Sequence, residues 1–250
     1  MADRKLAQEM TYAEITRLID FAILEPYWSE DIVKDYIHQA VQYECALAAM
    51  NPTHLEFGSD ITKGTKTKFG VSADFPFGQG TTESRILEAE SYCKSGVVEE
   101  IDFVSRIWLA KSGRWADYTS DLRTLADICK NYGVLSKVII ESDCLTLDEV
   151  RRCTVCAADA GMDFVKTCTG YVKGVDRVGP TDEVIKAMIE AAEGRIHVKA
   201  SSVIRTKSRV IELVNLGVER MGIGCTSVPK VLGVSPEEYQ RVKDQPFGEA

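Results

Sequence analysis

The sequence predicts a (β/α)8 barrel, and three observations lead to this prediction. Eight short apolar runs alternate with segments of helical periodicity along the 250 residues. Successive runs are spaced about 25 to 35 residues apart, as parallel strands joined by helices require. The runs are apolar on both faces, which is typical of a parallel sheet that is covered on both sides. The alternative is a doubly wound open sheet, whose glycine-rich first turn is missing from FAILEPYW.

The eight apolar runs are the predicted strands. They cover residues 20–24, 45–50, 69–75, 100–105, 136–141, 163–169, 195–201 and 220–224. An extra helix over residues 4–18 precedes the first strand, and we expect it to close the bottom of the barrel. Neither a linker nor a low-complexity segment interrupts the pattern, so residues 1–250 are expected to form a single domain.

Capping residues predict where the intervening helices begin and end. Residues suited to an N-cap open four of them, namely Ser29, Thr81 or Thr82, Thr146 (in a capping box with Glu149) and Thr181. Glycines in the C-terminal capping role close five helices, namely Gly96, Gly133, Gly161, Gly194 and Gly217. The helices therefore alternate with the strands over most of the chain.

Charge and composition exclude several classes of protein. A formal net charge of −8 disfavours a nucleic-acid or anionic-membrane surface. No apolar run reaches the roughly 18 residues needed to span a bilayer, and MADRKLAQEM lacks the apolar centre of a signal peptide. We therefore expect a cytoplasmic protein that binds a small molecule, and neither nucleic acid nor membrane.

The eight cysteines are scattered without the spacing of a disulfide framework. Cys153 and Cys156 form a C-x-x-C pair, but the pair lies in a helical segment without two further ligands nearby, so it cannot complete a zinc shell. A redox or metal role for this pair is the less favoured interpretation. The sequence predicts no bound metal.

Three charged residues interrupt the apolar strands. Asp102, Lys166 and Lys199 each stand between apolar or small neighbours in the fourth, sixth and seventh predicted strands. Any one of them alone is explained equally well as a solvated strand end. All three occupy corresponding places in their strands, and barrel enzymes carry their catalytic groups at the carboxyl ends of the strands. We therefore expect the three side chains to converge.

This set of residues suits imine chemistry. A lysine attacks a carbonyl only when its amine is unprotonated, and both burial and a neighbouring cation favour that form. Two ammonium groups ~6 Å apart at an effective dielectric of ~20 repel by about 2.8 kcal/mol, or about two pKa units. Lys166 is the predicted nucleophile, Lys199 its activating neighbour and Asp102 a proton relay.

Lys137 is a fourth charged residue in a predicted strand, SKVIIES, which ends near Glu141. Two interpretations are equally open from the sequence. Lys137 either pairs with Asp102 and keeps it ionised, or it begins its strand in water.

Five segments resemble a known family, the deoxyribose-phosphate aldolases. FVKTCTG, HVKASSVIRT, EIDFV, KVIIES and DFPFG are similar to its signature segments and occur in the same order, over about residues 15 to 232. The resemblance implies a TIM barrel with Lys166 as Schiff-base lysine, Lys199 as its partner and Asp102 as proton relay. It further implies cleavage of 2-deoxyribose 5-phosphate to acetaldehyde and glyceraldehyde 3-phosphate, without metal or cofactor, by a homo-oligomer, commonly a dimer. The substrate-binding residues it suggests are Lys137, Thr167, Thr169, Gly170, Ser201, Ser202, Gly222, Gly224 and Cys225.

The sequence departs from the family where phosphate is bound. Ser202 and Val203 occupy the positions of two glycines, and Gly224 and Cys225 occupy those of two serines. A β-branched valine must crowd that site or change its backbone conformation.

Two interpretations of these departures follow. Either phosphate is held differently, by Lys173, Arg177 or Arg205, or the substrate is unphosphorylated or bulkier. An alternative of another class is a barrel that has lost catalysis and acts as a binding or regulatory subunit. The retained Lys166, Lys199 and Asp102 argue against that alternative.

Overall fold

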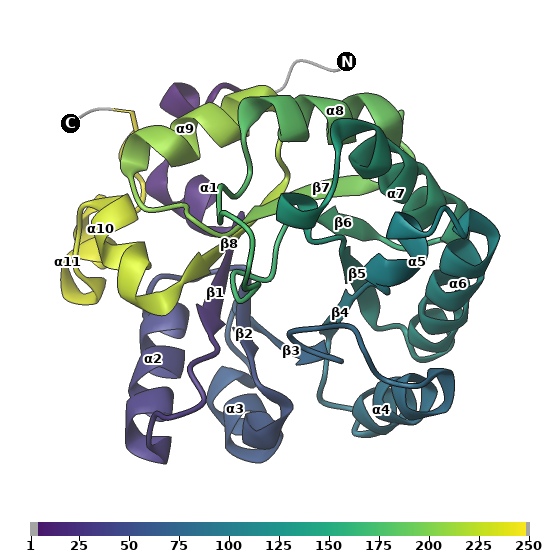
Figure 1. Cartoon of the computed structure of the whole chain (residues 1–250). Helices are drawn as coiled ribbons and strands as arrows, with labels where there is room; N and C mark the ends of the chain where they lie inside the picture. Colours follow the sequence, from purple (N-terminus) through teal and green to yellow (C-terminus); the bar gives the residue numbers. More distant parts are fainter. Residues whose placement is uncertain (1–4, 249–250) are drawn as a thin grey trace. The chain divides into compact units, whose positions relative to one another are not determined.

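The computed structural model describes residues 5–248, and within them the strands follow the order β1-β2-β3-β4-β5-β6-β7-β8 of a closed barrel (Figure 1). The predicted (β/α)8 barrel is therefore confirmed. By packing, the chain divides into two compact units. Unit 1 combines the N-terminal segment up to residue 69 with the C-terminal segment from residue 204, and unit 2 is residues 70–203.

All eight strands lie within two or three residues of their predicted positions, apart from a shorter sixth strand. They are β1 (Ile19–Ile23), β2 (Leu47–Met50), β3 (Lys68–Ala73), β4 (Glu100–Val104), β5 (Leu135–Ile139), β6 (Phe164–Lys166), β7 (His197–Ser201) and β8 (Arg220–Gly224). The α-helices are α1 (Tyr12–Thr16), α2 (Glu30–Gln42), α3 (Leu55–Thr62), α4 (Thr82–Lys94), α5 (Ile107–Lys111), α6 (Trp115–Tyr132), α7 (Leu147–Ala160), α8 (Asp182–Ala192), α9 (Lys207–Leu216), α10 (Val228–Leu232) and α11 (Pro236–Val242). Short 3-10 helices are η1 (Ala7–Glu9), η2 (Pro52–His54), η3 (Ser142–Cys144) and η4 (Cys225–Ser227).

Unit 2 contains the strands that carry the predicted catalytic residues. In it β3 pairs with β4, β4 with β5, β5 with β6 and β6 with β7, all in parallel. Helices α4, α6, α7 and α8 pack against one another in that order. β4 is buried along its whole length, although it carries the two acidic residues Glu100 and Asp102.

Unit 1 has β1 at the centre of a parallel arrangement, between β2 and β8. The prediction of a single N-terminal helix over residues 4–18 is wrong. Residue 4 lies outside the described part of the chain, and the following residues form two short helices, η1 and α1. The break has a local cause, because Thr11 caps α1 in a capping box with Glu14. The buried ring of Phe247 packs edge-on against Tyr12, with ring centroids 5.1 Å apart.

The predicted helix boundaries are largely confirmed. The side chains of Thr81, Thr146 and Thr181 accept hydrogen bonds from the first turns of α4, α7 and α8. Ser29 occupies the N-cap of α2, but its side chain makes no capping bond. The five glycines expected at helix ends all have positive φ. None of the helices in the described part of the chain has the length and apolar content needed to cross a membrane.

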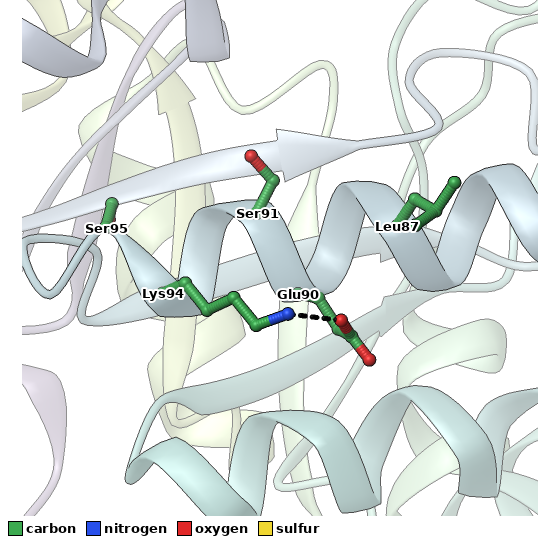
Figure 2. A pocket seen from close by; sticks show the side chains of 5 residues that line it. All are labelled: Leu87, Glu90, Ser91, Lys94 and Ser95. Atoms are coloured by element: carbon green, nitrogen blue, oxygen red, sulfur yellow. Dashed lines mark hydrogen bonds and ion pairs between the residues drawn. The ribbon is translucent and has the colours of Figure 1, made fainter.

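A pocket on unit 2 lies on the surface of α4. It has a volume of about 490 Å³ and is lined by Leu87, Glu90, Ser91 and Lys94 of this helix and by its C-cap residue Ser95 (Figure 2). Lys94 and Glu90, one helical turn apart, form an ion pair at 2.5 Å. A pocket made by the surface of one helix, with an ion pair of this kind, is a solvated face rather than a reaction site.

Candidate active site

The strand register brings the predicted catalytic residues together in unit 2. Asp102 of β4 is the cross-strand partner of Lys137 in β5, and Lys166 of β6 is the partner of Lys199 in β7. Lys166 also pairs with Ile139, which lies two residues beyond Lys137. Counted along the register, Lys166 and Lys199 therefore stand two residues beyond the position that pairs with Asp102. The strands of a closed barrel are tilted and staggered, so such an offset is compatible with side chains that meet inside the barrel.

A single carboxylate oxygen joins the two predicted catalytic lysines. The Nζ atoms of Lys166 and Lys199 each donate a hydrogen bond to Oδ2 of Asp102 at 2.7 Å. The three side chains are nearly inaccessible, with exposures of 6% for Lys166, 1% for Lys199 and 3% for Asp102. The alternative that they are solvated strand ends is therefore wrong.

The electrostatics of Asp102 are set by two opposing effects. Burial raises the pKa of this carboxyl group, but three surrounding ammonium groups outweigh burial and hold the pKa well below its usual range. Asp102 is thus ionised near neutral pH, and its carboxylate accepts hydrogen bonds from the ammonium groups of Lys166 and Lys199.

Lys137 is fully buried, which decides between the two interpretations left open by the sequence. Its Nζ lies 3.0 Å from Oδ1 of Asp102 and 2.6 Å from Oε2 of Glu100. Lys137 therefore pairs with Asp102 and does not begin its strand in water. We call Glu100, Asp102, Lys137, Lys166 and Lys199 the lysine cluster.

Glu100 was missed by the sequence reasoning, although a signal was available. Glu100 lies two residues before Asp102 in β4, so both side chains point to the same face of the strand. A glutamate that is 1% exposed requires a cationic partner, and Lys137 provides it.

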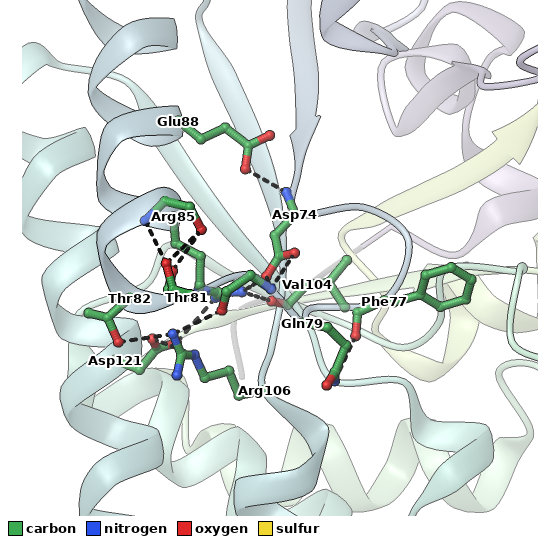
Figure 3. A network of polar contacts seen from close by, with 12 residues as sticks. Asp74, Phe77, Gln79, Thr81, Thr82, Arg85, Glu88, Val104, Arg106 and Asp121 are labelled. Atoms are coloured by element: carbon green, nitrogen blue, oxygen red, sulfur yellow. Dashed lines mark hydrogen bonds and ion pairs between the residues drawn. The ribbon is translucent and has the colours of Figure 1, made fainter.

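A second buried network holds the loop after β3. Arg85 of α4 forms ion pairs with Asp74 and, at 3.1 Å, with Asp121, and it donates to the carbonyl oxygen of Val104 at 3.0 Å (Figure 3). Arg106 lies 3.1 Å from Asp121. We call Asp74, Arg85, Arg106 and Asp121 the arginine network. It connects the ends of β3 and β4 to helices α4 and α6.

Several predicted substrate-binding residues have protein partners. Thr167 and Ser201 join the ends of β6 and β7, because Thr167 Oγ1 donates to the Ser201 carbonyl and accepts from the Ser201 amide, both at 2.9 Å. The amide and hydroxyl groups of Thr169 both donate to Glu141. Burial raises the pKa of Glu141, and these bonds oppose that effect. Thr167, Ser201 and Thr169 therefore shape the strand ends.

Ser202 and Val203 follow directly after β7 with left-handed backbones, at φ of +75° and +54°. The chain thus keeps the conformation that favours glycine, although neither residue is glycine. The Val203 side chain is 43% exposed. It lies so close to Gly179 that a Cβ added there would meet Val203 Cβ at 3.2 Å. Gly170, also in this unit, has φ of +84°, and its carbonyl accepts from Arg177 at 2.8 Å.

The remaining predicted binding residues belong to unit 1. Gly222 and Gly224 are in β8 and are at least partly accessible. Cys225 begins η4 and is buried, and burial raises the pKa of its thiol to about 12. A thiol in this state is a small packing group rather than a nucleophile.

Metal-ligating groups gather at one place among the described residues. Atoms of Glu141, Asp143 and Cys168 lie within 4.8 Å of one another. Each residue already has a protein partner: Thr169 donates to Glu141, the Gly179 amide donates to Asp143, and Cys168 bonds to Ser142. These contacts explain the cluster as the support of the loop after β6. Cys153 and Cys156 are both buried in α7 with free thiols.

The chain is similar to aldolases in sequence and in fold. No family model matches the chain. The chain is 34% identical over 227 residues to "Deoxyribose-phosphate aldolase 2" of Bacillus licheniformis, covering 90% of this chain and 99% of that protein. It is 30% identical over 230 residues to "Deoxyribose-phosphate aldolase" of a Thermoanaerobacter species, covering 92% and 98%.

The chain belongs to the deoxyribose-phosphate aldolase family. Enzymes of this family are lyases, so the prediction of a carbon–carbon lyase is confirmed. Solved structures agree with the fold. "QR15, an Aldolase" has a TM-score of 0.80 at 27% identity, covering 91% of this chain and 96% of that one. A tetrameric deoxyribose phosphate aldolase of Aeropyrum pernix has a TM-score of 0.79 at 24% identity, covering 92% of each chain.

Proposed function

We propose that the protein cleaves 2-deoxyribose 5-phosphate to acetaldehyde and glyceraldehyde 3-phosphate through an imine on Lys166. The observation that carries the proposal is the contact of Lys166 and Lys199 with one oxygen of Asp102, at 2.7 Å each. Through that oxygen a proton can pass between the two amines. This gives a route by which Lys166 becomes the free amine that attacks a carbonyl.

The reaction follows from this arrangement. The Lys166 amine adds to the aldehyde carbon C1, and loss of water gives an iminium ion. Removal of the proton from the C3 hydroxyl breaks the C2–C3 bond, releases glyceraldehyde 3-phosphate and leaves an enamine on Lys166. Protonation at C2 and hydrolysis then release acetaldehyde and restore the amine. Asp102 and Lys199 exchange the protons of these steps.

Reductive trapping tests the proposal. Protein incubated with acetaldehyde and then borohydride should carry an irreversible ethyl adduct on Lys166, mapped by peptide mass spectrometry. Lys166→Met is the control, because it removes the nucleophile and should lose the adduct while the rest of the chain is unchanged. Absence of an adduct in the wild type, with acetone and dihydroxyacetone also failing, would favour the inactive binding subunit instead.

Ser202 and Val203 support a second candidate, the same chemistry on an unphosphorylated or bulkier substrate. Both carry side chains on left-handed backbone directly after β7, three and four residues beyond Lys199. Phe77, Val175 and Val178, in the loops after β3 and β6, are also exposed apolar residues. Such side chains favour apolar over phosphorylated groups.

The two candidates are separated by comparing kcat/KM for 2-deoxyribose 5-phosphate and 2-deoxyribose. The first predicts a preference for the phosphorylated sugar in the wild type. The second predicts no such preference, and a selective gain for the phosphorylated sugar in the Ser202→Gly/Val203→Gly variant, because glycine opens the backbone to an anion. Leu87→Ala, an exposed change on α4, is the control.

A homo-oligomeric state and a cytoplasmic location stay predictions. The Aeropyrum pernix relative is described as a tetramer, and a dimer is what we propose for this chain. Light scattering coupled to size-exclusion chromatography measures the state directly.

A further inference from the structure

The two oxygens of Asp102 have different partners. Oδ2 accepts from the two catalytic lysines, and Oδ1 lies 3.0 Å from the ammonium group of Lys137. A carboxylate otherwise rotates readily about its last bond, because that torsion has broad minima. The contact with Lys137 opposes this rotation, so Oδ2 stays directed at both catalytic amines.

Lys137 is itself held in place. Its Nζ lies 2.6 Å from Oε2 of Glu100, and both side chains are completely inaccessible. Lysine is a flexible point charge on a four-carbon chain, and a single contact with Asp102 would leave its position poorly defined. Glu100 gives the ammonium group a second anchor on the same strand as Asp102.

The charges of the lysine cluster explain why Glu100 and Lys137 occur together. Attack on a carbonyl requires neutral Lys166, and the cluster then holds two ammonium groups and two carboxylates, which balance. Without Glu100 the same state would hold an uncompensated buried positive charge, which is costly. Glu100 and Lys137 together add no net charge, so they can orient Asp102 without changing the charge of the site.

We propose that Lys137 and Glu100 are positioning residues for Asp102. In this role Lys137 does not contact the substrate, contrary to what the family resemblance implied. This role rests on the proposed imine mechanism. Lys137 orients the carboxylate that passes protons between Lys166 and Lys199, and Glu100 orients Lys137.

The variant Glu100→Gln/Lys137→Met tests this role. Removing both charges together avoids an unpaired buried ion, so this protein is expected to fold and to trap acetaldehyde on Lys166. We expect kcat for the retro-aldol reaction to fall roughly 10- to 100-fold, below the 10²- to 10⁴-fold contribution of a full acid–base group, with KM unchanged.

The pH profile gives a second readout. Lys137 is one of three cations that lower the pKa of Asp102, the other two being Lys166 and Lys199, and Glu100 is the further charged group of the cluster. Loss of Lys137 raises that pKa, so the acidic limb of kcat should move to higher pH. Lys137→Arg keeps the cation and should therefore recover part of the lost kcat and part of the shift of the acidic limb. It also gives an independent measurement if the double variant is unstable.

Four results overturn the proposal. Wild-type kcat and pH profile in the double variant would mean that the pair only fills the barrel. A raised KM at unchanged kcat would mean that Lys137 contacts the substrate. Lys137→Arg that is no more active than the double variant would contradict an orienting cation. Failure of the wild type to trap acetaldehyde would remove the proposed mechanism itself, and this role with it.

Discussion

The lysine cluster and the arginine network are two buried ionic networks within unit 2, and they differ in the cation that each uses. In the lysine cluster three ammonium groups surround Asp102, and in the arginine network two guanidinium groups surround Asp121. Arginine stays protonated in proteins and presents a rigid fork of donors, whereas lysine loses its proton when its surroundings favour the neutral amine. The arginine network is therefore suited to holding a loop, and the lysine cluster to chemistry.

The central aspartates of the two networks, Asp102 and Asp121, have pKa values shifted in opposite directions. Burial raises the pKa of Asp121, and the nearby guanidinium groups of Arg85 and Arg106 only partly offset it, so the net shift is upward. Burial also acts on Asp102, but three ammonium groups outweigh it and the net shift is downward. Asp102 has three close ammonium groups, whereas Asp121 has two guanidinium groups and also the carboxylate of Asp74 nearby, which raises its pKa further.

The same substitution in each network should sharpen this comparison, and the larger effect is expected for Lys166→Met. The variant should lose the trapped adduct and at least about 10⁴-fold of the retro-aldol rate, or about 5 kcal/mol of transition-state stabilisation. Its free energy of unfolding should change little, because Lys137 and Lys199 still neutralise Asp102. Steady-state kinetics and urea unfolding measure both quantities. Large destabilisation with retained turnover would contradict the assignment of chemistry to this cluster.

Arg85→Met should have the opposite result. Asp74 and Asp121 would both lose an ion pair in a site where their side chains are 14% and 10% exposed. Removal of one partner of a buried ion pair costs about 3 to 5 kcal/mol of unfolding free energy. We expect urea unfolding to show that loss, and the purified folded fraction to trap acetaldehyde normally. Loss of trapping in fully folded protein would mean that the arginine network also acts in catalysis.

The smallest expected effect is on the pH dependence of stability. A carboxyl group whose folded pKa is raised contributes stability at low pH that is lost as the pH rises above its ordinary value, 3.8 for Asp121. A lowered pKa, as for Asp102, contributes stability that is present above 3.8 and lost as the pH falls.

Urea unfolding between pH 3 and pH 6 measures this contrast, through the stability difference between wild type and each Asp→Asn variant. The difference should decrease with rising pH for Asp121→Asn and increase for Asp102→Asn, by up to about 1.4 kcal/mol per pH unit where the carboxyl group is ionised in only one of the folded and unfolded states. Slopes of the same sign in both variants would contradict the contrast between the networks.

The barrel and the buried lysine of its sixth strand could be predicted from the sequence for a physical reason. Strand periodicity, capping threonines and left-handed glycines act over a few residues, so the pattern that encodes them is legible without the fold. Lys166 was found for a related reason, because a charge inside an apolar strand is costly wherever the strand lies. The prediction of one continuous N-terminal helix was wrong because a capping box, Thr11 with Glu14, starts a new helix within it.

What the sequence by itself determined is the strands, the helix boundaries and the list of costly interior charges. The convergence of Asp102, Lys166 and Lys199 was expected from the sequence, but only the tertiary structure decided the partners of Lys137. The register places Asp102 opposite Lys137, and Glu100 reaches Lys137 from a neighbouring strand. The structure also decided that Ser202 and Val203 keep the left-handed backbone. Contacts between strands that are 30 to 100 residues apart depend on register and side-chain reach, which local sequence patterns do not encode.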